Sequence, residues 1–216
     1  KQRIEAKARE VAEYCGFSQG MCYSFESPKV FDKLCLDEND VLRNAIEISN
    51  PLGEDYKIMR TISLNGMLTS LSTNYNRRNK DAKLYELANI YLPKSLPLTE
   101  SPDERMQFTL GFYGDGDFFT MKGVVEEFFD SIGMSNKIIY DPKSSKKFLH
   151  PGRQANICYG GKVCGYLGEV HPEAALNYDI KEGTEVYLLV LDIPAILPLV
   201  TFERIYEGIA RFPSTG

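Results

Sequence analysis

Two strand-like segments joined by a pair of glycines put the strongest constraint on the fold of this chain. Residues 155–159 and 163–168 carry apolar and aromatic side chains, and Gly160-Gly161 lies between them. Two β-type runs separated by two glycines are typical of a β-hairpin, because glycine readily adopts the left-handed backbone that a tight turn needs. The sequence therefore predicts neighbouring antiparallel strands in this part of the chain.

The remaining segments predict further strands, with helices between groups of them. These strands are predicted at residues 21–25, 44–48, 81–91, 106–113, 137–140 and 184–192. A helix stays open as the alternative for 81–91, since its Leu, Glu and Ala residues also favour helix. This succession favours a mixed α+β fold with a largely antiparallel sheet over a regular parallel βαβ series.

The clearest helix covers residues 120–132. Its apolar side chains recur at three- and four-residue spacing and form one stripe, while Glu126, Glu127 and Asp130 lie outside that stripe. Other helices are predicted at residues 2–15, after Ser27-Pro28, at 63–76, at 172–178 and, as a single turn, at 194–197. Stripes of this kind predict helices that pack on the faces of the sheet.

Length and composition fit one sizeable core. The chain has 216 residues, of which 43% are hydrophobic, enough for one core or for a core with a small appendage. No apolar run approaches the roughly 18 residues of a membrane span, and residues 1–10 lack the apolar core of a signal peptide. We therefore expect a cytoplasmic protein without membrane contact. Both ends look cut, since a helix opens at the first residues and no closing element precedes Gly216, so we expect a fragment of a longer chain.

The charge balance argues against nucleic-acid binding by the module as a whole. The formal net charge is −5, whereas nucleic-acid-binding domains usually carry a positive excess. A local patch remains open at Arg77, Arg78 and Lys80, the densest basic run, with Arg153 as a fourth contributor. These residues could contact RNA phosphates or an acidic partner, or the run could be a solvated helix end whose cations suit the helix dipole.

The side chains that usually carry chemistry form no recognisable motif. The five cysteines show no CxxC spacing, which predicts reduced thiols and no zinc site. His150 and His171 each precede a proline, so we expect turn histidines with satisfied ring nitrogens. The glycines of residues 111–117 lack the lysine and Ser/Thr of a phosphate-binding P-loop. From chemistry alone the chain does not reveal a function.

Seven segments, taken in chain order, resemble the bacterial phenylalanyl-tRNA synthetase β subunit. The most specific is NPLGEDYKIMRT at residues 50–61. The others are KQRIE (1–5), CGFSQGMCYSF (15–25), NYNRRNKDAKLYELANIY (74–91), DFFTMKG (117–123), HPGR (150–153) and GYLGEVHP (165–172). Together they span nearly the whole chain, and their order carries the resemblance more than any single segment does.

The resemblance implies both a fold and a role. The family enzyme is an (αβ)₂ heterotetramer that uses ATP and magnesium to attach phenylalanine to tRNA(Phe), and its α subunit carries the active site. Its β subunit contains a module with the class II synthetase fold, an antiparallel sheet flanked by helices, without the chemistry. We therefore expect residues 1–200 to be this pseudo-catalytic core and residues 201–216 to begin a linker to a missing anticodon-binding domain.

The resemblance also points to a degenerate class II pocket at Glu86. Active class II enzymes hold ATP with an arginine and a glutamate in one strand pair and with a second arginine near a glycine-rich strand. Here Glu86 remains, but Lys83 is the only nearby cation in sequence, and residues 184–200 contain neither glycine nor arginine. We expect no catalytic residue, bound cofactor or metal in this fragment.

Residues 1–25 and 48–76 resemble the region by which class II cores associate. We predict that they contact the α subunit, with Asn50, Pro51, Arg60 and Thr61 shaping that edge; alternatively, these four residues only close a turn of the core. Two other functions stay open. A free-standing class II-fold amino-acid ligase would need two arginines converging on Glu86, and an RNA-binding module would use the basic residues named above.

Overall fold

A seven-stranded sheet forms the centre of the computed structural model, which describes residues 1–134 and 137–202. The strand order is β1-β4-β5-β9-β8-β7-β6; β1 runs parallel to β4, and every other neighbouring pair is antiparallel. The strands are β1 (Ser18–Gln19), β4 (Ala82–Leu92), β5 (Asp103–Tyr113), β6 (Ile138–Asp141), β7 (Leu149–Tyr159), β8 (Lys162–Val170) and β9 (Val186–Asp192). β2 (Phe25–Glu26) and β3 (Ile58–Met59) form a separate two-stranded sheet.

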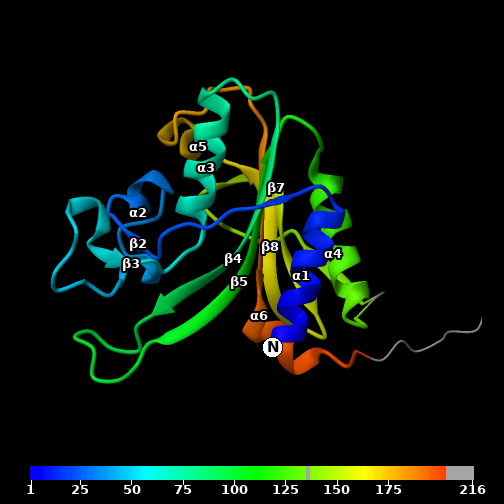
Figure 1. The fold of residues 1–216 in the computed structure, drawn as a ribbon, viewed down its shortest axis with the longest axis horizontal. Helices are drawn as coiled ribbons and strands as arrows, with labels where there is room; N and C mark the ends of the chain where they lie inside the picture. Colours follow the sequence, from blue (N-terminus) through cyan, green and yellow to red (C-terminus); the bar gives the residue numbers. More distant parts are fainter. Residues whose placement is uncertain (135–136, 203–216) are drawn as a thin grey trace, which may run out of the picture.

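Helices cover both faces of the large sheet (Figure 1). The α-helices are α1 (Gln2–Tyr14), α2 (Val30–Lys33), α3 (Leu64–Asn76), α4 (Phe118–Ser131), α5 (Pro172–Asn177) and α6 (Ile193–Ile196). α1 and α4 lie side by side on one face, and α3 and α5 lie on the other (Figure 1). Beyond α3, the short helix α2 and the β2–β3 sheet form a smaller layer at the side of the molecule.

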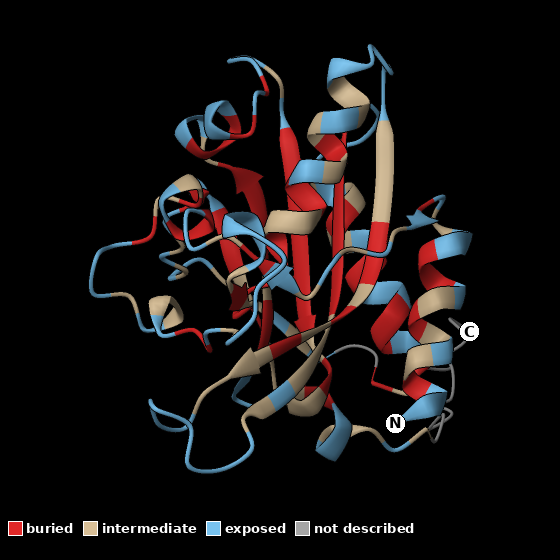
Figure 2. Cartoon of the chain, turned by 60° about the vertical axis from the view of Figure 1, so that its left-hand side comes forward, coloured by how far each residue is buried: buried red, intermediate tan, exposed pale blue. Residues whose placement is uncertain are grey.

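The central strand β9 shows why two cores form. Its alternate residues Val186, Leu188 and Val190 are buried in the core beneath α3 and α5. Tyr187, Leu189 and Leu191 point to the other face and join the core beneath α1 and α4. Because successive strand side chains point to opposite faces, a strand that is apolar throughout must be covered on both sides. Buried residues accordingly run along the central strands (Figure 2).

Most predicted elements are confirmed, within a few residues at their ends. The mixed α+β fold with a mostly antiparallel sheet is as expected. The hairpin turn between β7 and β8 is formed by Gly160 and Gly161, whose φ angles are 56° and 76°. β7 starts earlier than predicted and includes residues 149–154. For residues 81–91 the strand is correct and the helical alternative is wrong, since β4 pairs along its whole length with β5.

Two predicted strands are wrong. Between residues 20 and 24 the chain crosses from the large sheet to the small one, and strand geometry begins only at Phe25. Along this crossing the Cys22 N–H is bound by a side chain instead of a neighbouring strand. Residues 44–48 form only one isolated bridge, between Glu47 and Ile58. The strand facing them, β3, is only two residues long, so pairing is confined to this bridge and the two backbone hydrogen bonds that flank it.

Candidate functional site

Glu86, the residue expected in a degenerate pocket, lies on β4 beneath the side chain of Arg60. Both residues are almost fully buried, with exposed fractions of 5% and 3%. The Arg60 Nη1 and Nη2 atoms each lie 3.4 Å from Glu86 Oε1, and the Cys22 backbone N–H donates to the same oxygen over 3.1 Å. The expectation that Lys83 is the only cation near Glu86 is therefore wrong. Lys83 instead pairs with the exposed Asp115, at 3.2 Å.

The guanidinium of Arg60 is held by several groups at once. Its Nε donates to the Asn89 carbonyl over 2.7 Å, and its Nη1 reaches the Tyr23 carbonyl at 3.5 Å. Together with Glu86, these acceptors use donors on all three guanidinium nitrogens. Arg60 therefore ties the β3 end of the small layer to β4, and its donors do not point to a vacant site.

The sheet face that carries Glu86 is filled by α3. Thr109 lies opposite Glu86 on β5, and its hydroxyl contacts that of Ser63, the residue before α3, at 2.7 Å. Two residues further along β5, Gly111 has no side chain to hold the helix away. A Cβ added there would lie 2.8 Å from Leu71 Cδ1 and 2.9 Å from Met67 Cγ, both on α3. Close helix packing thus leaves this part of the sheet without room for a triphosphate.

The three arginines that a free-standing ligase could use do not meet. Arg60 alone contacts Glu86. Arg105 pairs with Asp103 and, through its Nε at 3.1 Å, with Asp192. The Arg153 Nη1 atom binds Glu169 at 2.6 Å. Across residues 1–134 and 137–202 no second arginine joins Arg60 at Glu86, so the arrangement that a free-standing ligase would need is not met.

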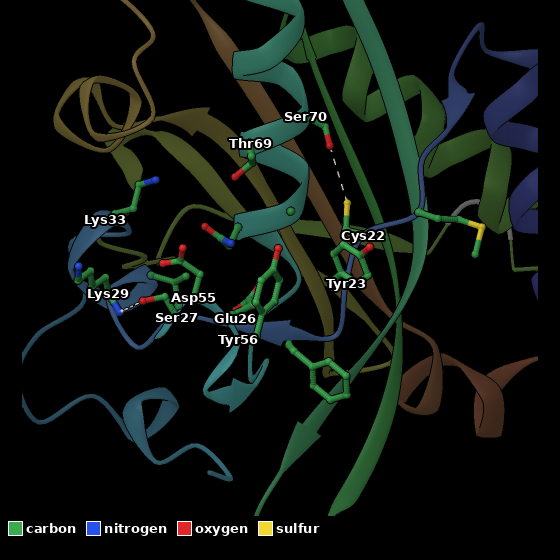
Figure 3. A pocket seen from close by; sticks show the side chains of 15 residues that line it. Cys22, Tyr23, Glu26, Ser27, Lys29, Lys33, Asp55, Tyr56, Thr69 and Ser70 are labelled. Carbon is green, nitrogen blue, oxygen red and sulfur yellow. Dashed lines mark hydrogen bonds between the residues drawn. The ribbon is translucent and has the colours of Figure 1, made fainter. Parts of the chain in front are cut away.

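A pocket of about 510 Å³ opens beside this cluster, between α3, α2 and the segment before β2 (Figure 3). Tyr23 and Tyr56 contribute rings in edge-to-face contact, with centroids 5.8 Å apart. Thr69 and Ser70 come from α3, and the Cys22 thiol lies 3.8 Å from the Ser70 hydroxyl. Burial and the nearby Glu86 raise the pKa of that thiol, so Cys22 is not an activated nucleophile.

Glu26 is the functional candidate that sequence reasoning missed. It lines the pocket and is 4% exposed; neither carboxyl oxygen makes a hydrogen bond of standard geometry, although the Asn65 side chain lies close enough to lower the Glu26 pKa. Burial raises the pKa of Glu26 to about 8, against the opposing effect of Arg60. The sequence feature that could have pointed to Glu26 is its place as an acid between Phe25 and Ser27, directly after a mostly apolar run.

The four residues predicted at the subunit interface divide into two pairs. Asn50 and Pro51 are exposed, whereas Arg60 and Thr61 are buried. The Thr61 hydroxyl donates to the Leu42 carbonyl at 2.5 Å. Asn50 and Pro51 could meet a partner directly, whereas Arg60 and Thr61 could shape such an edge only by holding the small layer in place.

The basic run lies at the end of α3, and its residues are exposed. Arg78 and Lys80 border a cavity of about 720 Å³ that Lys181 also lines. Arg77 follows directly on α3 as its C-terminal cap residue. Arg153 belongs to a different cavity and is neutralised by Glu169, so it does not extend the basic patch.

The two histidines act as local caps. His150 Nδ1 accepts the Gly152 N–H and His171 Nδ1 accepts the Glu173 N–H, each at 3.1 Å. These contacts satisfy the Nδ1 atom of each ring; His171 lies at the N-terminus of α5, whereas His150 lies within β7 and not in the turn that was predicted. Among the described residues no group of three or more His, Cys, Asp or Glu side chains could hold a metal ion. Nor is any helix in the described ranges long and apolar enough to cross a membrane.

Comparison with known proteins gives consistent results. The family model "Phenylalanyl tRNA synthetase beta chain CLM domain" matches residues 1–193. The phenylalanine–tRNA ligase beta subunit of Clostridium acetobutylicum is 39% identical over 213 residues, which are 99% of this chain and 26% of that protein. The Clostridium tetani subunit is 36% identical over 214 residues, again 99% of this chain and 26% of that protein. The chain thus spans about a quarter of the length of these relatives.

Among solved structures, the pyrrolysyl-tRNA synthetase from Desulfitobacterium hafniense is similar, with a TM-score of 0.72. The likeness covers 92% of this chain and 68% of that chain at 12% sequence identity. At this identity the likeness shows a shared fold and carries no information on activity.

Proposed function

Because the chain belongs to the phenylalanyl-tRNA synthetase β-chain CLM domain family, we propose that it is a non-catalytic structural module of the β subunit of phenylalanine–tRNA ligase. In this role it supports an α subunit that performs the ATP- and magnesium-dependent aminoacylation of tRNA(Phe). The proposal includes a class II-type core over residues 1–200 and a cytoplasmic location. It also assigns residues 201–216 to a linker, of which only Thr201 and Phe202 lie among the described residues.

One observation carries the non-catalytic role: Glu86 is met by a single guanidinium whose donors are already used. Adenylate formation needs fixed positive charge on the polyphosphate, typically from arginines that remain free to bind it. β9 adds aliphatic side chains to this face, and its one charged residue, Asp192, binds Arg105 and caps α6. The packing of α3 on Gly111 further supports a closed face.

Amino-acid-dependent pyrophosphate exchange tests this role. The isolated chain, given ATP, phenylalanine and magnesium, should show no exchange above background. The complex of the full-length protein with the α subunit should show exchange under the same conditions. Calorimetry with ATP should show no saturable heat for the isolated chain. Exchange or tight ATP binding by the chain alone would favour the free-standing ligase.

The proposed partner is the α subunit in an (αβ)₂ heterotetramer. Asn50 and Pro51 lie in an exposed loop, and next to them Leu52 exposes 90% of its surface. An apolar side chain so exposed in a loop suits a protein contact. Co-purification of the full-length protein with the α subunit should weaken for Leu52→Asp and should be unaffected by Val163→Asp, a change at an exposed apolar residue of the β7–β8 hairpin. Equal recovery of both variants would contradict this edge as the contact.

The basic run at Arg77, Arg78 and Lys80 is proposed as a contact for tRNA or for an acidic partner surface within the holoenzyme. Phosphate contacts of this kind weaken steeply as salt rises. Replacing the three residues by Ala should lower the salt dependence of tRNA binding by the complex, measured by filter binding. An unchanged salt slope would identify the run as a solvated helix end.

A further inference from the structure

The buried cluster at the small layer contains more acid than base. Glu26 and Glu86 are both almost fully buried, and Arg60 is the one cation that acts on both carboxyl groups. The hydrogen bonds of Arg60 go to Glu86 and to backbone carbonyls, and none goes to Glu26. A buried carboxyl group without a partner is costly, so proteins normally supply a hydrogen bond or an opposite charge. While Glu26 keeps its proton it needs no counter-charge, but once it is ionised the missing partner is a positive charge.

The unpaired carboxyl group borders a pocket suited to such a charge. Three oxygens lack a hydrogen bond: both of Glu26 and Glu86 Oε2. Tyr23, Phe25 and Tyr56 provide aromatic rings to the pocket that Glu26 lines (Figure 3). A carboxylate combined with aromatic rings is the surrounding that binds ammonium and guanidinium groups well, because ring faces attract cations while carboxylate oxygens accept their protons.

The rim of this pocket indicates that the cation comes on a protein. Met21 and Tyr23 expose 92% and 75% of their surfaces at the pocket edge, more than a buried small ligand would need. Exposed apolar side chains around a polar centre are typical of a protein interface, in which an apolar ring excludes water from a central charged contact. Two cations, Lys29 and Lys33, line the α2 side; Lys29 is exposed and Lys33 lies over the Tyr178 ring at 4.3 Å.

We propose that this pocket receives a lysine or arginine side chain of the α subunit, which places its cationic head against the Glu26 carboxylate and its stem along the outer surface of the Tyr23 and Tyr56 pair. The inference rests on the proposed function, since it names the anchor by which the partner binds. The incoming head supplies the missing positive charge, and the rim residues cover its stem. Glu26 is a binding residue in this scheme and takes no part in aminoacylation.

Affinity measurements on the full-length protein with its α subunit test the proposal. Glu26→Gln keeps the size of the side chain and removes its charge, so binding should weaken at least tenfold at pH 8.5. Glu182→Gln is the matched control, because Glu182 is exposed and does not line this pocket, and its binding should stay within twofold of the wild type. Glu26→Gln with wild-type affinity would overturn the inference and leave the proposed function intact.

The pH dependence of binding gives a second readout. The titratable groups that act on the Glu26 carboxyl are Arg60, Glu86 and Tyr178, the Asn65 side chain lies beside it, and the charged residues Lys29, Lys33 and Asp55 line the same pocket. With a pKa of about 8, Glu26 must release a proton to pair with a cation. Wild-type affinity relative to Glu26→Gln should therefore rise roughly twentyfold between pH 6.5 and 8.5. A constant ratio across this range would contradict the assigned pairing.

A binding experiment with a small guanidinium compound separates the proposed function from the proposed cation site. If wild-type protein does not bind the α subunit, the proposed function fails, and n-butylguanidinium then decides the inference. Saturable amide shifts around Tyr23 and Tyr56 in the wild type, lost in Glu26→Gln, would support a cation site. No saturation in the wild type would overturn it. Thermal melting of Glu26→Gln at or above the wild-type temperature shows that the variant is folded.

Discussion

Glu86 and Glu26 are both almost fully buried near the same guanidinium, but their surroundings differ. Glu86 accepts from Arg60 and from the Cys22 N–H on a sheet face that α3 covers. Glu26 has no hydrogen-bond partner and borders an open pocket. Only the second arrangement leaves a charge to be completed from outside the chain. The difference separates an acid that holds the fold together from an acid that we assign to binding.

The strongest test of the difference between Glu86 and Glu26 is to remove Arg60, the guanidinium that acts on both. Arg60→Met should destabilise the protein by about 3–5 kcal/mol, because it leaves two buried carboxyl groups without a cation and breaks the link between the small layer and β4. Urea unfolding followed by circular dichroism measures the loss. Arg77→Ala is the control, since Arg77 is exposed, and it should change stability by less than about 0.5 kcal/mol.

A double variant shows whether the loss comes from Glu86. Glu86→Gln combined with Arg60→Met should recover part of the lost stability, because no charge is then left opposite the missing guanidinium. If Arg60→Met alone unfolds no more easily than Arg77→Ala, the ion pair contributes nothing, and the two glutamates do not differ in the way proposed.

Glu26→Gln tests whether the buried Glu26 carboxyl lowers the stability of the unbound protein. Above pH 8 the variant should be more stable than the wild type by about 1–3 kcal/mol, because an unpaired buried charge is removed. A binding residue that costs stability in the unbound protein is expected where function competes with folding. The measurement is the free energy of unfolding of both proteins from pH 5 to pH 9.

The sign of the pH effect follows from the raised pKa of Glu26. The folded protein holds this proton up to a pKa of about 8, whereas the unfolded chain loses it near the ordinary glutamate pKa of 4.5. Between these values the folded state binds more protons, so wild-type stability relative to Glu26→Gln should fall as pH rises and level off above pH 8. Wild-type stability that instead falls relative to Glu26→Gln as pH decreases would mean that Glu26 is charged and paired in the folded protein.

Gly111→Ala tests the close packing of α3 on the sheet face that carries Glu86. The new methyl group would lie within 3 Å of Leu71 and Met67, so α3 must shift, and a loss of about 1–2 kcal/mol is expected. Gly123→Ala in α4 is the matched control, because nothing lies within 4 Å of its added Cβ and alanine favours a helix interior by about 0.5–1 kcal/mol. Calorimetric melting of both variants should therefore show opposite shifts.

The sequence carried enough information for the sheet and the main helices, since their apolar periodicities reflect packing on two faces. The apolar run of residues 184–192 predicted the strand β9, whereas its burial on both faces is a finding of the structure. Apolar periodicity did not predict the crossing at residues 20–24. The Cys22 N–H in this crossing is bound by Glu86, which is distant in sequence. For the same reason Lys83, three residues away, was expected to be the only cation near Glu86, whereas the structure places Arg60 there.

Site residues were predicted unevenly, for a physical reason. Glu86 was found because the resemblance pointed to its strand, and the exposed basic run at Arg77, Arg78 and Lys80 was visible as composition. Glu26 was missed because burial of an acid without a partner is a property of the tertiary structure. Single acids in apolar runs usually sit on a solvated face of a strand, and sequence alone does not tell which face is covered.

The smallest expected effect concerns Lys83, and it tests whether local sequence position matters for Glu86 at all. Lys83 pairs with Asp115, whose side chain is 79% exposed, and such surface pairs contribute about 0–1 kcal/mol. Lys83→Gln should therefore change the free energy of unfolding by less than about 0.5 kcal/mol, and that small change should disappear in 1 M salt because exposed charges are screened. Urea unfolding at low and high salt measures it. A large loss that persists in salt would place Lys83 with Glu86 after all, and Glu86 would then share its charge with two cations while Glu26 has none.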